Sequence, residues 1–353
     1  MAADELIFDE GVLAPEPLVE FQGDHGAAHT GGLAILPWRG PWLEAEASGT
    51  RAVAAAPDPS EAQFGQALVH VQKSRAATWR DLGAAWELLE TGGRLLVCGG
   101  NDLGITSVVK RLAEQLGQPA RILSNRRHAR IVAFERGPGP APLPAEPSRI
   151  DLALPDGRRA SLHAEPGVFS AKRLDTGTQL LLDTLESEAA PDRILDLGCG
   201  IGPLGLASLV RWPEARALFL DGDARAVASA ERNLGALSLE TRAEVCWWDA
   251  EESCPETGFD LALVNPPFHG GEAVDLRPAR AMFTRLAEAL AVGGRALIVA
   301  NRSLPYERDL EGAGSMKILS DSRGYKIIAF TRRSAARSQQ RGRGSRSSRA
   351  PRR

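Results

Sequence analysis

An internal repeat is the feature that most constrains the fold of this chain of 353 residues. Three apolar blocks occur twice in the same order, and the two occurrences of each block are about 200 residues apart. Chance rarely preserves both order and spacing for three blocks, so we infer two copies of one α/β unit. The paired blocks are residues 67–73 with 262–268, 92–97 with 293–298, and 130–134 with 326–330.

The second copy contains a strand that runs directly into glycines at alternate positions. The apolar segment 194–197 precedes Gly198, Gly200 and Gly202. Glycine lets the backbone turn tightly and approach a ligand that a Cβ atom would block. A helix and a second strand follow, and that strand ends in Asp221, which can accept hydrogen bonds from both hydroxyls of a ribose. This order of elements predicts a site for a nucleoside-containing cofactor.

Three further acids near the loop are candidates for the same site. Asp196 lies in the strand before the loop, and Asp249 follows an apolar run from which it can meet an adenine amino group. We include both residues in the predicted cofactor site. Asp223 is a weaker ribose candidate, because it lies two residues past the strand and can cap the next helix. A NAD dehydrogenase is the competing interpretation of the loop, and the motif described next disfavours it.

The motif Asn265-Pro266-Pro267-Phe268 follows the apolar segment 259–264, which predicts a short buried strand. Proline cannot donate to a sheet and rejects helix, so the asparagine is presented at the carboxyl end of the strand, where ligands bind. The Asn265 side-chain oxygen and the Pro266 carbonyl could accept both hydrogens of a planar amino group and aim its lone pair at a methyl group. Phe268 could stack on the substrate ring.

This motif is typical of S-adenosylmethionine-dependent methyltransferases that act on planar amino or amide nitrogens. We therefore predict that all four of its residues serve catalysis and that Asn265 also lies against the cofactor. A plain proline turn is the alternative interpretation of the motif taken alone, and the glycine loop upstream argues against that alternative.

The first copy lacks these features at the corresponding places. The segment 70–73, His-Val-Gln-Lys, stands where the second copy has Asn-Pro-Pro-Phe. No glycine-rich turn follows its early strands, and we place residues 35–38 in that general region. Trp38 and Trp42 are interpreted as packing residues, because aromatic side chains are usually buried. The first copy is therefore expected to be degenerate, with an RNA-binding or a structural role.

Composition divides the chain into segments. Residues 137–147 contain five prolines and predict a stiff linker between a first domain at 1–136 and a catalytic domain at 148–331. Residues 332–353 contain nine arginines and no acid, so the net charge of −3 leaves −12 on the rest of the chain. This tail can bury no core, and we expect it to be disordered and to contact an anionic partner.

Other global features indicate a cytoplasmic globular protein. Hydrophobic residues make up 43% and charged residues 25% of the chain, as is usual for soluble domains. No apolar run approaches the length of a membrane span, and the N-terminus lacks a signal-peptide pattern. The four cysteines have no metal-ligand spacing, so we expect reduced thiols and no bound metal.

The second copy resembles the bacterial ribosomal RNA guanine-N2 methyltransferases, both the methyltransferase C type that acts on the small subunit and the methyltransferase G type that acts on the large one. The resemblance rests on segments 166–170, 174–178, 195–202, 265–270 and 299–306. It implies tandem Rossmann-like class I methyltransferase domains with doubly wound mixed sheets, of which the first is degenerate. It also implies S-adenosylmethionine as the cofactor, held by the three loop glycines and Asp221, and a guanine held by residues 265–268. The implied partner is ribosomal RNA or a ribosomal subunit, with small-subunit RNA favoured, and we expect a monomer.

Three other functions stay open at this point. A large-subunit ribosomal RNA guanine-N2 methyltransferase would carry the same motifs. A protein glutamine methyltransferase uses a similar loop, usually with tyrosine at the aromatic place, so Phe268 and the duplication count against it. A non-catalytic RNA-binding protein would need neither the glycine loop nor Asn265, so their joint presence counts against that function.

Overall fold

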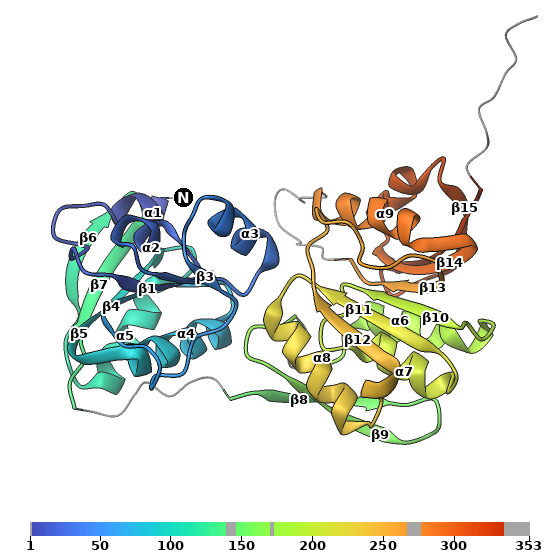
Figure 1. Cartoon of the computed structure of the whole chain (residues 1–353), viewed down its shortest axis with the longest axis horizontal. Helices are drawn as coiled ribbons and strands as arrows, with labels where there is room; N and C mark the ends of the chain where they lie inside the picture. Colours follow the sequence, from blue (N-terminus) through green and yellow to red (C-terminus); the bar gives the residue numbers. More distant parts are fainter. Residues whose placement is uncertain (1, 139–145, 170–172, 267–276, 335–353) are drawn as a thin grey trace, which may run out of the picture.

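The computed structural model describes residues 2–138, 146–169, 173–266 and 277–334 of the chain. Its two domains each contain a seven-stranded mixed sheet covered by helices (Figure 1). A two-stranded hairpin, β8 (Ser148–Ala153) with β9 (Arg159–Ala164), leads into the second domain. Within the described ranges, no helix is both long and apolar enough to cross a membrane.

In chain order, the first sheet contains β1 (Leu18–Phe21), β2 (Leu33–Ile35), β3 (Ala52–Val53), β4 (Phe64–His70), β5 (Leu89–Gly100), β6 (Arg121–Arg126) and β7 (Ala129–Glu135). Its helices are α1 (Ala2–Leu6), α2 (His25–Thr30), α3 (Arg39–Ala47), α4 (Arg75–Leu88) and α5 (Ile105–Leu116). The second sheet contains β10 (Arg193–Leu197), β11 (Arg216–Asp221), β12 (Ala243–Trp247), β13 (Phe259–Val264), β14 (Leu290–Asn301), β15 (Gly314–Ser322) and β16 (Tyr325–Arg332). Its helices are α6 (Thr176–Thr184), α7 (Pro203–Arg211), α8 (Ala224–Ala236) and α9 (Arg277–Ala289), with short turns η1 (Leu185–Ser187), η2 (Glu240–Arg242) and η3 (Tyr306–Leu310).

Both sheets have the same topology. The strand order is β3-β2-β1-β4-β5-β7-β6 in the first sheet and β12-β11-β10-β13-β14-β16-β15 in the second. In each sheet a single strand, β7 or β16, runs antiparallel to its neighbours. Every strand of the first sheet therefore has a counterpart in the second, and the predicted duplication is confirmed.

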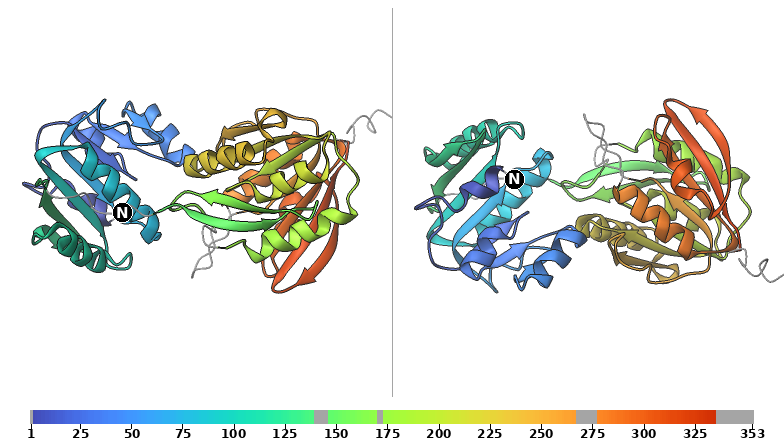
Figure 2. Two further views of the ribbon diagram at one scale, coloured as in Figure 1. Left: turned by 90° about the horizontal axis from the view of Figure 1, so that it is seen from below. Right: turned by 90° about the horizontal axis from the view of Figure 1, so that it is seen from above.

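The core of the second domain lies on both faces of its sheet. Parallel strands covered on two sides are almost continuously apolar, and the last four residues of β13 are all buried. Helices α6, α7 and α8 pack on one face together with the hairpin, while α9 and η3 pack on the other. Figure 2 shows the sheet between these two layers. The strand order reverses between β10 and β13, and ligands of such sheets bind outside the carboxyl ends of the strands at this point.

Strand register identifies equivalent positions in the two copies. Glu20 occupies the place in β1 that Asp196 occupies in β10. His70 likewise occupies the place of Asn265, one residue beyond the part of the strand that pairs with β1 or β10. The catalytic motif and its degenerate counterpart therefore align as the repeat predicts.

The expectation that residues 35–38 replace the glycine turn is wrong. The glycine turn follows β10, so its counterpart is the turn after β1, at residues 22–24. Residues 35–38 instead comprise the last residue of β2 and the turn after it, and they correspond to residues 220–223 at the end of β11. Leu36 therefore stands where the second copy has the ribose candidate Asp221.

In the first copy, the residues at the places of Asp196 and Asn265 contact each other. Glu20 is fully buried, accepts a hydrogen bond from the amide of Ala27 (2.8 Å) and pairs with His70 Nε2 (2.7 Å). At the corresponding places there is thus no carboxylate for a ribose and no amide for a substrate. These replacements agree with a degenerate first copy.

The two domains meet at equivalent turns, the one after β2 and the one after β11. The backbones of Trp38 and Asp223 form an antiparallel bridge. These two residues occupy equivalent positions in the two copies. The contact therefore resembles a two-fold symmetric interface, in which the same surface of each copy meets its equivalent. Two backbone hydrogen bonds of 2.8 Å flank the bridge, from Ala224 to Pro37 and from Arg39 to Gly222.

Candidate active site

The loop between β10 and α7 depends on glycine at three positions. Gly198, Gly200 and Gly202 have φ angles of 75°, 56° and 88°, in the left-handed region that other residues rarely adopt. The amide of Gly198 donates to the carbonyl of Leu220 (2.8 Å), which fastens the loop to the end of β11. A Cβ atom on Gly200 would meet no described atom within 4 Å. The backbone of this loop can therefore approach a ligand closely.

Asp221 ends β11 directly beside the loop. Its Oδ2 accepts a hydrogen bond from the amide of Gly200 (2.8 Å), and its Oδ1 accepts one from the amide of Asp223 (2.9 Å). Burial raises the pKa of the Asp221 carboxyl to about 6, although the backbone donors oppose this shift. The group is thus mostly ionised at neutral pH, and each oxygen keeps a lone pair for a ribose hydroxyl.

Asp196 lies underneath the loop. Its side chain is completely buried, and its Oδ2 accepts a hydrogen bond from the amide of Gly205 (2.8 Å) in the first turn of α7. The other oxygen, Oδ1, is buried without a hydrogen-bond partner among the residues described. Burial raises the pKa of this carboxyl to about 7. This position indicates that Asp196 supports the loop and the start of α7 from below.

Asn265 leaves the end of β13 with its side-chain amide held in one orientation. Its Nδ2 donates to Asp175 Oδ2 (3.2 Å) and to Thr178 Oγ1 (2.9 Å). Asp175 also caps α6 by accepting from the amide of Thr178 (3.1 Å), so both acceptors are rigidly placed. Because Nδ2 is engaged in this way, Oδ1 is the atom that a substrate amino group can meet. A Cβ atom on Gly198 would lie 3.9 Å from the backbone oxygen of Asn265, so the catalytic and glycine loops adjoin.

Asp249 lies at the same edge of the sheet, one strand further out. The amide of Trp248 donates to the carbonyl of Asp221 (2.9 Å), which continues the pairing of β12 with β11. Asp249 Oδ1 accepts from the amide of Glu251 (2.9 Å), and its own amide donates to Glu252 Oε2 (3.1 Å). Asp221 and Asp249 thus follow neighbouring strands, as contacts to the ribose and the base of one nucleoside require.

The described part of the catalytic motif ends at Pro266, which is buried. Pro267 and Phe268 lie outside the described residues, so their catalytic roles stay predictions. The structure nevertheless brings the glycine loop, the acids and Asn265 to one edge of one sheet, where the strand order reverses.

Known proteins match this chain over most of its length. Residues 159–329 match the family model of the methyltransferase small domain. The ribosomal RNA small subunit methyltransferase C of Pseudomonas entomophila is 35% identical over 275 residues, which cover 77% of this chain and 80% of the relative. The protein of the same name from Pseudomonas putida is 36% identical over 275 residues, with the same two shares. The chain belongs to the ribosomal RNA small subunit methyltransferase C family.

A solved structure shows the architecture of this family over nearly the whole chain. The T. thermophilus 16S rRNA N2 G1207 methyltransferase (RsmC), in complex with AdoMet and guanosine, matches with a TM-score of 0.82 at 26% sequence identity. The match covers 94% of this chain and 92% of that chain. As a member of the family, the protein is an S-adenosylmethionine-dependent ribosomal RNA methyltransferase with tandem class I domains, which confirms the fold class and the cofactor predicted from sequence.

The residues of the site fit the family's cofactor. S-adenosylmethionine carries a ribose with two hydroxyls, and Asp221 presents two oxygens with lone pairs beside the glycine loop. The cofactor also needs close approach to the backbone, and Gly200 leaves that space open. The buried Oδ1 of Asp196 has no donor among the described residues, and a cofactor with an ammonium group could supply one through water.

Two features of this edge were not predicted from the sequence. The Nε1 of Trp247 donates to the carbonyls of Gly222 (3.0 Å) and Pro37 (3.1 Å). The buried guanidinium of Arg225 donates from Nε and Nη2 to the two oxygens of Asp223 (2.8 Å each). Asp223 does cap α8, as its position suggests, but sequence patterns give no sign that a nearby arginine is buried against it.

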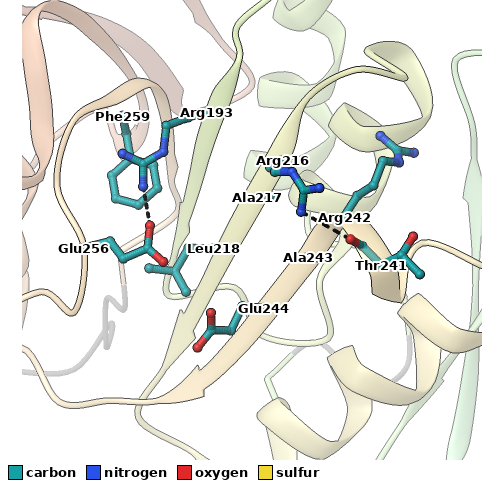
Figure 3. Close-up of a pocket in the computed structure, with 10 residues that line it drawn as sticks. All are labelled: Arg193, Arg216, Ala217, Leu218, Thr241, Arg242, Ala243, Glu244, Glu256 and Phe259. Carbon is teal, nitrogen blue, oxygen red and sulfur yellow. Dashed lines mark hydrogen bonds and ion pairs between the residues drawn. The ribbon is translucent and has the colours of Figure 1, made fainter.

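A cavity of about 230 Å³ lies at the opposite edge of the second sheet (Figure 3). Its lining includes the first residues of β10, β11, β12 and β13. Arg193 pairs with Glu256 and stacks on Phe259 (4.8 Å to the ring centre), while Arg216 donates to the carbonyl of Thr241 (3.4 Å). Because the cofactor motifs lie at the carboxyl ends of these strands, this cavity is not part of the methyl-transfer site.

Proposed function

We propose that the protein methylates the exocyclic N2 amino group of a guanine in small-subunit ribosomal RNA. The observation that carries this proposal is the fixed amide of Asn265. Its Nδ2 donates to Asp175 and Thr178, which leaves Oδ1 as a hydrogen-bond acceptor beside the glycine loop. An acceptor in that position is what a planar amino group needs in order to become a nucleophile.

The reaction requires an activated amino nitrogen. The lone pair of a guanine amino group is delocalised into the ring, which makes the nitrogen a poor nucleophile. Acceptance of its two N–H hydrogens by Asn265 Oδ1 and the Pro266 carbonyl localises and orients that lone pair. S-adenosylmethionine, when bound, supplies a methyl group on a sulfonium centre. The new N–C bond forms as the S–C bond breaks, and the methylated amine then loses one proton to solvent.

The choice of guanine is supported by the family and not by the loop. Adenine N6, cytosine N4, guanine N2 and a glutamine amide all present two hydrogens on a planar nitrogen. The T. thermophilus relative is named as an N2 methyltransferase of 16S rRNA and was solved with guanosine. A paired guanine hides N2 in the minor groove, so the base must be unpaired or flipped out. Phe268 is proposed to stack on it, which would contribute about 1–3 kcal/mol.

The remaining groups are assigned supporting roles. The degenerate first domain and the arginine tail at 332–353 are proposed to hold RNA around the target base, acting in the cytoplasm on a ribosomal subunit or its RNA as a monomer. Asp196 is proposed to support the cofactor loop from below. Direct cofactor contacts are assigned to Gly198, Gly200, Gly202, Asp221, Asp249 and Asn265.

Substitution of Asn265 tests the proposal. Asn265→Ala should lower kcat by about 10²–10³-fold, the usual loss when one group that acts in the transition state is removed, with cofactor affinity nearly unchanged. The measurement is methyl incorporation into ribosomal RNA at saturating cofactor. Asn301→Ala is the matched control, because Asn301 also ends a strand of this sheet but binds locally to Ser303 N (3.1 Å) and Oγ (2.9 Å). Near-wild-type turnover of Asn265→Ala would show that another group activates the amine.

A further inference from the structure

An aromatic side chain of the first domain stands at the rim of the cofactor site in the second. Trp38 is 48% exposed, so the prediction that it is a packing residue is wrong. Its ring lies over Gly222, where a Cβ atom would be 3.8 Å from Cε3 and 3.9 Å from Cζ3 of the indole. Gly222 directly follows Asp221. Trp38 therefore occupies the direction in which a side chain at position 222 would project.

The segment that carries Trp38 is fastened to the loop of Asp249. The guanidinium of Arg39 donates two hydrogen bonds to Glu252 (2.9 Å each). Glu252 in turn accepts from the amide of Asp249 (3.1 Å). Arg39 also lies 5.1 Å from the centre of the Trp247 ring, on which its charge is attracted to the π-face. Contacts of its immediate neighbour thus fix Trp38 relative to the acids of the cofactor site.

The surroundings of Gly222 suit a planar base. A nucleoside whose ribose is bound by Asp221 must leave its base close to that carboxylate. Gly222 offers the base no side chain, and a Cβ there would lie 3.6 Å from the carbonyl of Trp248, the residue before Asp249. Trp38 contacts this position and is about half exposed, so part of its side chain is available to a ligand. Stacking of a purine on an indole is favourable, and it would remove exposed surface of the indole from water.

We propose that Trp38 forms one wall of the adenine subsite, so that the first domain completes the cofactor site of the second. The inference rests on the assignment of Asp221 and Asp249 to S-adenosylmethionine. The degenerate copy then contributes to methyl transfer through a residue of its own after losing its own cofactor site. The two-fold contact between the domains is what brings this residue to the catalytic copy.

Cofactor titrations of substituted proteins test this inference. Trp38→Ala should bind S-adenosylmethionine about tenfold more weakly, the usual effect of removing one stacking partner. Adenosine should lose affinity by the same factor, because it carries the base and ribose without the methionine. Trp38→Phe should keep most of the affinity, since a phenyl ring still stacks. Phe8→Ala is the matched control: Phe8 is 54% exposed, lies in the same domain and contacts His29, and this variant should bind like the wild type.

Two further variants, Trp38→Leu and Asp221→Ala, address misfolding of Trp38→Ala and an incorrect cofactor assignment. If Trp38→Ala does not fold, as judged by its melting temperature, Trp38→Leu replaces it, because leucine fills space without an aromatic face. Wild-type affinity in a folded Trp38→Ala or Trp38→Leu protein overturns the inference. Asp221→Ala separates this failure from a failure of the underlying assignment. If only Asp221→Ala binds more weakly, the cofactor site is correctly assigned but Trp38 is not part of it. If binding is unchanged in both variants, the assignment of the cofactor site is refuted.

Discussion

At the scale of single residues, hydrogen bonds to neighbouring groups fix the orientation of the side chains in the site. Asp221 and Asn265 could be predicted from the sequence, because an acid at a strand end and an asparagine before two prolines each have few structural uses. Trp38 and Trp247 could not, because their roles depend on contacts between segments far apart in the chain. Trp247 and Pro37, for example, are 210 residues apart and share a hydrogen bond.

Cofactor affinity should depend on pH through Asp221. The pKa of its carboxyl is about 6, and the ionised form is the better acceptor for ribose hydroxyls. Binding therefore favours the charged form, so affinity should be full well above the pKa and fall by about tenfold one pH unit below it. Calorimetric titrations across this range provide the measurement.

Asp221→Asn is the control for this pH dependence, because an amide does not titrate. The variant should bind more weakly at high pH and show a flatter profile. Burial also raises the pKa of the neighbouring Asp196 carboxyl, so this group can contribute to any slope that persists. A wild-type profile in Asp221→Asn would contradict the assigned role of Asp221.

At the scale of elements, the long apolar strands were predictable from the sequence, whereas the short strand β1 of the first domain was not. The repeated blocks belong to β4, β5, β7 and their counterparts, which are buried in the middle of each sheet. β1 was missed because the fully buried Glu20 interrupts its four residues. The groups that stabilise this acid, the Ala27 amide and the His70 ring, come from other elements. In a strand of only four residues, one buried acid is enough to obscure the hydrophobic pattern.

The start of α8 should depend strongly on Asp223. Its carboxylate accepts from the amide of Arg225 (3.0 Å) and from two guanidinium nitrogens of the same residue (2.8 Å each). Asp223→Ala removes the cap and leaves a buried cation unpaired, so the free energy of unfolding should fall by about 3–5 kcal/mol in urea denaturation. Asp183→Ala, in the last turn of α6 and away from the core, should change it by less than about 0.5 kcal/mol. A similarly small change in Asp223→Ala would show that Arg225 finds another partner or reaches water.

At the scale of the whole molecule, the second of the two duplicated domains carries the methyltransferase motifs, and the first domain packs against it. The duplication was predictable, because the repeated blocks form core strands whose close packing on both faces restricts them to apolar residues. The docking of the domains was not predictable, because it uses backbone groups of Pro37 and Gly222, which leave no mark in the sequence.

The chain should bind one S-adenosylmethionine. In the first copy Leu36 replaces the ribose acid, and His70, which pairs with Glu20, replaces Asn265. Calorimetry should therefore give a stoichiometry of one per chain, and Asp221→Ala should weaken that single event. Two binding events per chain would contradict the degeneracy of the first copy.

The identity of the methylated nucleoside tests the central claim most directly. Purified protein is incubated with methyl-labelled S-adenosylmethionine and with small and large ribosomal subunits, both assembled and as naked RNA, with Asn265→Ala as the inactive reference. The RNA is then digested to nucleosides and analysed by mass spectrometry. The account predicts label in N2-methylguanosine from small-subunit RNA. Label in another nucleoside, in large-subunit RNA or only in protein would contradict it.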